Sequence, residues 1–157
     1  MSNPCHRCRL TIFADYHQFY VLDPKKSGQH APEDWSNQDV TNRAKIARGV
    51  VVICPIRDMA VPVEVSIWDS EPQVIFGAWQ HVIEAPLATE GSIEIHECTG
   101  GSLACFSVDP GDYTVRGLYR GLDTLSEDGL EGKDFYEIQI WRSPCPDLRV
   151  VKQWSDG

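Results

Sequence analysis

The hydrophobic residues of this chain recur mainly at every second position, which is the spacing of a β-strand with one buried face. The alternation is clear in the segments 61–68, 92–98 and 135–141. The segment 50–56 is instead a dense run of β-branched residues, which is typical of a strand buried on both faces. The pattern therefore predicts a mainly β protein.

Further strands are predicted at 9–14, 17–22, 73–83 and 148–154, the last as an edge strand or a flap over the sheet. The stretch 103–121 predicts a long β-hairpin. Its turn is Asp109-Pro110-Gly111-Asp112, in which Gly111 suits the position of positive φ in a type II turn. Both arms mix apolar and polar residues, which predicts a sheet with one buried and one solvated face.

One segment has helical spacing instead. Ser36 is a suitable N-cap, and the acidic Asp39 follows three residues later, as in a capping box. The apolar positions of this helix, which is expected to end at Gly49, are Val40, Ala44, Ile46 and Ala47. With about eight or nine strands, one short helix after the first strands and no alternation of strands with helices, the chain is predicted to form an antiparallel β-sandwich, with an open barrel as the alternative.

The length of the chain fits a single domain, 1–157, whose ends at 1–8 and 143–157 are expected to be loosely attached. No apolar run is long enough to span a bilayer, and the N-terminus lacks the apolar segment of a secretory signal. We therefore expect a cytoplasmic protein with reduced cysteines. Cys5 and Cys8 form a lone Cys-x-x-Cys pair, for which a zinc site, a disulfide and unreactive thiols are all open.

The formal net charge of the chain is −9. Nucleic acid and anionic membranes repel a negative protein, so a basic protein or a cation is the expected partner. Acidic residues gather near the predicted turn and in the loop after it, namely Asp109, Asp112, Asp123, Glu127, Asp128, Glu131 and Asp134. Contact with a basic protein, binding of Ca²⁺ and simple solvation are the alternatives, and the spacing does not match an EF-hand. The candidate aromatic anchors beside these acids are Tyr119, Trp79 and Trp68.

The histidines show no spacing typical of a metal or catalytic site. A metal-dependent enzyme would use His17, His81 or His96, but the chain has neither an HxH pair nor an HExxH motif. The segment around His17 is expected to be structural, with Tyr16 and Phe19 in the core and the imidazole capped by a backbone carbonyl. We predict no catalytic residue, no metal and no cofactor.

Four short matches occur in the order found in a known family. They are Tyr16-His17-Gln18-Phe19 after the first strand, Asp34-Trp35 at the helix start, Gly49 before the strand-only region and Gly111-Asp112-Tyr113 at the late turn. Over 9–140 the chain resembles the competence protein J family of small acidic bacterial proteins, which inhibit the DNA-entry nuclease. The resemblance implies an immunity-like, cytoplasmic or cell-associated binder that blocks a nuclease active site without catalysis of its own. The longer loop at 123–132 and the extra terminal cysteines depart from the family.

The first hypothesis is therefore a non-catalytic protein that covers the basic active-site cleft of a partner nuclease or nuclease-type toxin. The contact residues are predicted to be Asp109, Asp112, Tyr119, Asp123, Glu127, Asp128 and Glu131. The alternatives are a small-ligand or carbohydrate-binding sandwich that uses exposed tryptophans, and a metal-dependent enzyme. The sequence does not define the oligomeric state.

Overall fold

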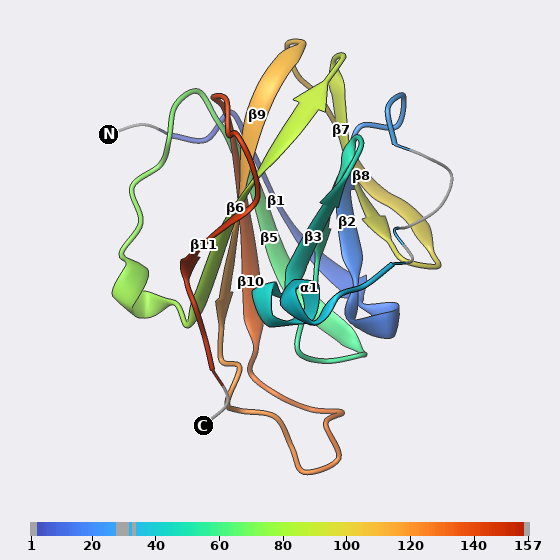
Figure 1. The fold of residues 1–157 in the computed structure, drawn as a ribbon, viewed down its shortest axis with the longest axis vertical. Helices are drawn as coiled ribbons and strands as arrows, with labels where there is room; N and C mark the ends of the chain where they lie inside the picture. The colour runs from blue at the N-terminus through green and yellow to red at the C-terminus, as the bar shows by residue number, and fades with distance from the viewer. Residues whose placement is uncertain (1–2, 28–31, 33, 156–157) are drawn as a thin grey trace.

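The computed structural model describes residues 3–27, 32 and 34–155, and two β-sheets that face each other dominate the fold (Figure 1). The six-stranded sheet has the order β1 (His6–Phe13), β5 (Ala60–Trp68), β10 (Phe135–Arg142), β9 (Gly111–Arg120), β6 (His81–Thr89) and β11 (Arg149–Lys152). The five-stranded sheet has the order β3 (Ala44–Ala47), β4 (Val50–Ile53), β2 (Phe19–Leu22), β7 (Ser92–Glu97) and β8 (Gly101–Ser107). The helical elements are α1 (Asn37–Asn42) and two 3₁₀ turns, η1 (Asp15–His17) and η2 (Phe76–Ala78).

The predicted mainly β sandwich with a short helix is confirmed. The described residues form eleven strands, more than expected, and one pair departs from the antiparallel pattern because β10 runs parallel to β5. A parallel pair requires a long crossover between its strands, and here the chain from β5 to β10 passes through both sheets. None of the helices among the described residues has the length and apolar character that crossing a bilayer requires.

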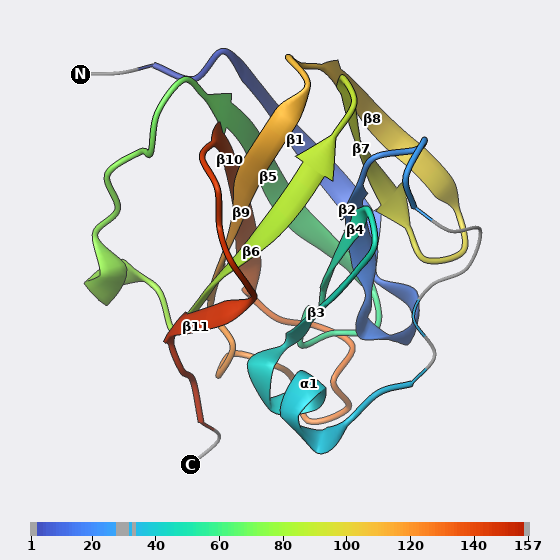
Figure 2. The ribbon, with the colours of Figure 1, turned by 45° about the horizontal axis from the view of Figure 1, so that its top comes forward.

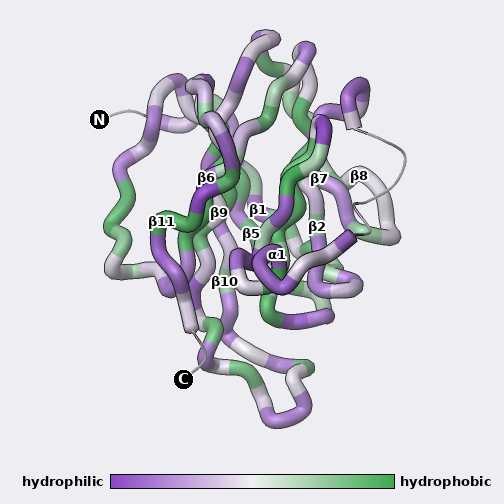
Figure 3. The backbone as a smooth tube through the Cα atoms, in the orientation of Figure 1, coloured by the Kyte–Doolittle hydropathy of each residue, from purple (hydrophilic) through white to green (hydrophobic). Residues whose placement is uncertain are grey.

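The core lies between the sheets. Along β5, Val61, Val63 and Val65 are fully buried and pack into the main cluster, whereas Glu64 on the opposite face is part of the outer surface of the sheet. Strand β4 is buried along its whole length, as its β-branched run predicted. Figure 3 shows the hydrophobic residues concentrated on the strands in the middle of the molecule.

The predicted hairpin at 103–121 is wrong, although both of its strands exist. Strand β8 pairs with β7 in the five-stranded sheet, and β9 pairs with β6 and β10 in the six-stranded sheet. The connection through Asp109 and Pro110 is therefore a crossover between sheets. Gly111 has φ of +154°, far from the value of about +80° that a type II turn requires. Alternation identifies a strand but does not tell which strand pairs with it.

Strand β9 also lacks the predicted solvated face, because its residues 113–119 are all buried. The inward residues pack into the core. On the outer face, the β5–β6 loop covers the sheet and is tied to it by the buried Arg116, whose guanidinium pairs with Glu71 and donates to the carbonyl of Pro72. The covering loop buries this outer face as a second layer of structure would. The polar residues that alternate along β9 are therefore not exposed.

The predicted helix is real but shorter. Ser36 and Asp39 form the expected capping box, in which each side chain accepts from the backbone N–H of the other. The helix ends at Asn42, and Arg43 adopts the left-handed conformation that was expected of Gly49. Residues 44–47 form β3 instead, because this segment pairs with β4 across a tight turn at Gly49, whose φ is +72°.

The strand predicted at 73–83 is mostly a loop with η2, and β6 begins only at His81. Trp79 packs with Val82 and Leu118 on the outer face of the six-stranded sheet. The apolar signal of Trp79 therefore comes from a loop that covers the sheet and not from a strand. Of the two alternatives for the tail, the structure has the edge strand, since β11 pairs with β6 at the edge of the sheet. The first residues of β1 lie within 1–8 and pair with β5.

Candidate partner-binding surface

The acidic residues predicted as one surface lie at two opposite ends of the molecule. Asp109 and Asp112 are exposed at the β8–β9 crossover, at the top of Figure 1. The β9–β10 loop, residues 121–134, lies at the bottom of the same view. The ten residues of β9 separate the two groups by about 30 Å, because a strand rises by about 3.3 Å per residue. The two groups of predicted contact residues therefore do not form one surface.

Tyr119 is wrongly predicted as a contact residue, because its side chain is fully buried. It points inward from β9, makes an edge contact with the rings of His81 and Tyr136, and donates its hydroxyl proton to the backbone carbonyl of Arg43 at 2.6 Å. The two tryptophans that were predicted as aromatic anchors together with Tyr119 are not exposed either. Trp79 is buried, and the half-buried Trp68 donates its indole N–H to Ser66.

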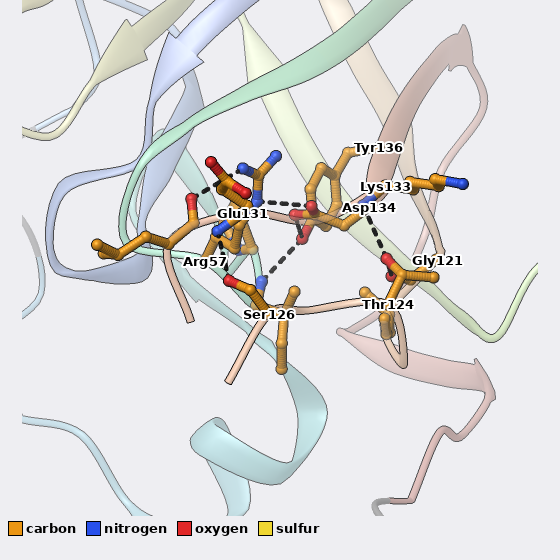
Figure 4. Close-up of polar contacts among 12 residues, drawn as sticks. Arg57, Gly121, Thr124, Ser126, Glu131, Lys133, Asp134 and Tyr136 are labelled. Carbon is orange, nitrogen blue, oxygen red and sulfur yellow. Dashed lines mark hydrogen bonds and ion pairs between the residues drawn. The ribbon is translucent and has the colours of Figure 1, made fainter. Parts of the chain in front are cut away.

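The β9–β10 loop, which we call the acidic loop (121–134), keeps its remaining predicted contact residues exposed; they are Asp123, Glu127, Asp128 and Glu131. Its backbone is held by polar contacts within the loop (Figure 4). Asp128 Oδ1 accepts from Ser126 Oγ at 2.6 Å and from the backbone N–H of Leu130 at 3.0 Å. Hydrogen bonding from Ser126 lowers the pKa of Asp128 below its usual value. Asp128 therefore shapes the loop as well as charging it.

A buried ion pair anchors the acidic loop to the body of the protein (Figure 4). Arg57 Nε lies 2.6 Å from Asp134 Oδ1, and Tyr136 donates its hydroxyl proton to Asp134 Oδ2 at 2.7 Å. Arg57 also donates to the carbonyl of Leu130 within the loop at 3.3 Å. Burial raises the pKa of Tyr136, which keeps its hydroxyl a donor to the carboxylate. Asp134, predicted as part of the acidic surface, is thus a buried structural residue.

An apolar cavity of about 350 Å³, which we call the Tyr16 pocket, lies on the five-stranded side of this end. Its lining comes from η1, α1 and the β4–β5 connection, and consists of Tyr16, His17, Gln18, Trp35, Val40, Arg43, Cys54, Pro55 and Ile56. The prediction that Tyr16 lies in the core is wrong, because the side chain is 68% exposed. Phe19 is in the core as predicted, and His17 Nδ1 lies 3.3 Å from the carbonyl of Pro55, as expected of a capped imidazole.

The acidic loop and the Tyr16 pocket belong to the same end of the molecule. Figures 1 and 2 show η1, α1 and the acidic loop together at this end. The β4–β5 connection joins them directly, because Ile56 lines the pocket while the next residue, Arg57, holds the loop. The backbone N–H of Ile56 also donates to the hydroxyl of Tyr136, which lies against Asp134. The acidic loop thus lies beside the apolar Tyr16 pocket, and residues 56 and 57 link the two.

The three histidines considered for a metal site have separate partners. His81 is buried, and its Nδ1 accepts from the backbone N–H of Trp154 while Nε2 lies 2.7 Å from the carbonyl of Asn42. Burial lowers the pKa of His81, in agreement with a neutral ring that has one donor and one acceptor nitrogen. His96 pairs with Glu94 on the same strand face. Among the described residues, no group of three or more potential ligands converges.

The alternative of a carbohydrate-binding groove requires exposed tryptophans. All five tryptophans of the chain are buried or half-buried, so no pair of exposed indole rings is available for stacking on a sugar.

The six cysteines, including Cys5 and Cys8, are free thiols in the structure. The thiol of Cys5 donates to Asp69 at 3.0 Å, and this hydrogen bond raises its pKa.

Comparisons with known proteins identify the fold. No family model and no curated protein matches the chain. Among solved structures, it is similar to the crystal structure of ComJ, inhibitor of the DNA degrading activity of NucA, from Bacillus subtilis. The match has a TM-score of 0.66 at 19% sequence identity and covers 91% of this chain and 99% of ComJ. The chain therefore has the ComJ fold, as the sequence resemblance implied.

Sequence reasoning missed two exposed residues of this surface, Val40 and Leu130, and treated Val40 as part of a buried helix face. A signal for Val40 was present. It is the only apolar residue among the six of α1, and a single residue cannot form the apolar stripe by which a helix packs onto a core. Leu130 lies between Gly129 and Glu131 in the acidic loop and is 50% exposed.

Proposed function

We propose that this protein is a non-catalytic inhibitor that binds a nuclease and covers its active-site cleft. The observation that supports this proposal best is the similarity of fold to ComJ, which extends over nearly the whole of both chains. At 19% sequence identity the similarity establishes the fold alone. The inhibitory activity is what we infer from it. His17, His81 and His96 are each engaged in a contact with another protein group, which agrees with a binding role.

The partner is proposed to be basic around its active site. A nuclease holds a polyanion in its cleft, and an acidic protein competes for the same charges. The net charge of −9 would also speed association by electrostatic steering. Of the two acidic ends, we assign the contact to the acidic loop, through Asp123, Glu127, Asp128 and Glu131. The reason is that Tyr16 and Val40 add exposed apolar side chains at this end. Asp109 and Asp112 lie outside the proposed contact.

The test is the rate of DNA degradation by purified nucleases in the presence of this protein. NucA serves as the reference enzyme, and the DNA-degrading nucleases of the source organism are assayed one by one. We expect the protein at micromolar concentration to abolish the activity of at least one of them by forming a stoichiometric complex. If every nuclease degrades DNA at its normal rate and forms no complex with the protein, the proposed function is wrong.

A further inference from the structure

Two exposed apolar side chains, from different elements, stand at the same cavity. Tyr16 of η1 is 68% exposed and Val40 of α1 is 63% exposed, and both line the Tyr16 pocket. Single exposed apolar residues are ordinary on protein surfaces. Here two of the most exposed ones in the described chain share a hollow with Trp35 and Ile56, so the surface has the shape and chemistry of a receptor for another apolar group.

The backbone holds Tyr16 outward at a conformational cost. Tyr16 and His17 are consecutive residues with φ of 57° and 58°, which is unusual for bulky side chains. Three contacts maintain this geometry: the N–H of Tyr16 donates to Asp58 Oδ1, the N–H of His17 donates to the carbonyl of Ala14, and the imidazole lies against Pro55. Unfavourable conformations that the surrounding structure maintains gather at binding sites.

The charge around the pocket is mainly acidic. Asp58 contacts η1 directly, Asp15 lies within it, and the acidic loop is attached through Arg57. The cation of Arg57 is neutralised by Asp134, and Lys45 by Asp39. Arg43 of the lining lies over the ring of Trp154. An apolar centre with an acidic rim complements a basic protein that presents an exposed apolar side chain.

We propose that the Tyr16 pocket receives one apolar or aromatic side chain of the basic partner, with Tyr16 and Val40 as the dominant contacts, while the acidic loop pairs with cations around that side chain. This inference rests on the proposed function and adds the element that selects the partner. Charge steers many basic proteins toward the loop, but only a partner with a fitting side chain fills the cavity of about 350 Å³.

The test compares three surface variants of the full chain. Tyr16→Asn removes the ring, and asparagine tolerates the positive φ at this position. Val40→Lys places a cation at the pocket. Ile75→Asn is the matched control, because Ile75 is an 82% exposed apolar residue in the β5–β6 loop. Figure 1 shows this loop at the left of the molecule, away from α1. Thermal unfolding of each variant is compared with that of the wild type to check that all three fold.

Binding is measured by surface plasmon resonance against NucA and against any nuclease that the wild type inhibits. We expect Tyr16→Asn and Val40→Lys to weaken the complex about tenfold or more, and Tyr16→Asn to act through faster dissociation with an unchanged salt dependence. The control is expected to bind as the wild type does. This pattern would establish the pocket as the site of an apolar anchor.

The other outcomes separate the two proposals. If the wild type binds no nuclease, the proposed function fails and the pocket assignment fails with it. If the wild type binds and both pocket variants retain its affinity, the pocket assignment is wrong while the inhibitor function stands. The assignment is also wrong if the wild type is a dimer by light scattering and Tyr16→Asn is a monomer, because the pocket would then bind a second copy of the chain.

Discussion

The two acidic ends of the sandwich carry similar charges in different surroundings. At the β8–β9 crossover, Asp109 lines a cavity of about 420 Å³ together with Asp69 and Arg142, so charges of both signs face it. The apolar side chains that line this cavity, such as Trp68 and Tyr113, are half-buried or buried. At the opposite end, the acidic loop adjoins an apolar pocket. Charge alone therefore does not mark a binding surface. Charge beside a water-excluding apolar centre is what protein interfaces contain.

The largest expected effect is the loss of the anchor that attaches the acidic loop. Asp134→Ala should lower the free energy of unfolding by about 3 to 4 kcal/mol, because it leaves Arg57 and Tyr136 without their buried acceptor. Urea denaturation measures the change. Asp112→Ala at the opposite end is the control and should cost less than about 0.5 kcal/mol. Equal losses in the two variants would contradict the structural role of Asp134.

The glycines at the two ends of β9 should also differ. A Cβ on Gly121, whose φ is +70°, would lie 2.4 Å from the backbone oxygen of Lys133, whereas a Cβ on Gly111 would meet the exposed side chain of Arg142 at 2.8 Å. Backbone cannot yield as a long side chain can. Gly121→Ala should therefore cost about 3 kcal/mol and Gly111→Ala about 1 kcal/mol in thermal or urea unfolding. The reverse order would show that the acidic loop is held less firmly than its contacts indicate.

Charge neutralisation tests the two ends in binding. The double variant Glu127→Gln/Glu131→Gln should slow association with an inhibited nuclease by about five- to tenfold at low ionic strength, with little change at high salt. The matched variant Asp109→Asn/Asp112→Asn removes the same charge from the other end and should change the rate by less than about twofold. Stopped-flow kinetics provides the measurement. A larger effect at the crossover would assign the contact to that end.

The smallest expected effect concerns a carboxyl on the outer face of the six-stranded sheet, next to Glu64. Burial, together with the hydrogen bond and the negative charge of Glu64, raises the pKa of Glu137 from 4.5 to about 7. The folded state thus binds this proton more tightly than the unfolded chain does. The resulting stability is present below about pH 4.5 and is lost as the pH rises through about 7, a change of about 1 kcal/mol after solvent screening.

Glu137→Gln tests this contribution, because glutamine keeps the shape and stays neutral. The unfolding free energies of the variant and the wild type are compared between about pH 5 and about pH 8. The variant should lack the decline of about 1 kcal/mol that the wild type shows over this interval. An identical pH dependence in both proteins would show that Glu137 titrates normally.

Local patterns predicted the parts of the fold that local chemistry controls. The alternation of Val61, Val63 and Val65 identified β5, and the capping box of Ser36 and Asp39 identified the start of α1. Both signals depend on residues a few positions apart. The acidic loop was likewise recognised from its composition, but its position beside the Tyr16 pocket was not, because Arg57 and Asp134 are 77 residues apart in the chain.

Patterns within short segments of the chain were enough to predict the class of the fold, the place of most strands and the acidic character of the protein. Three features depend instead on the packing of distant segments: β8 and β9 belong to different sheets, Tyr119 is buried, and Tyr16 is exposed. The physical reason is that a strand's pairing and a side chain's burial depend on which distant segments pack against them. Tyr16 and Tyr119 are chemically the same residue, and only their position in the sandwich separates a core side chain from a surface one.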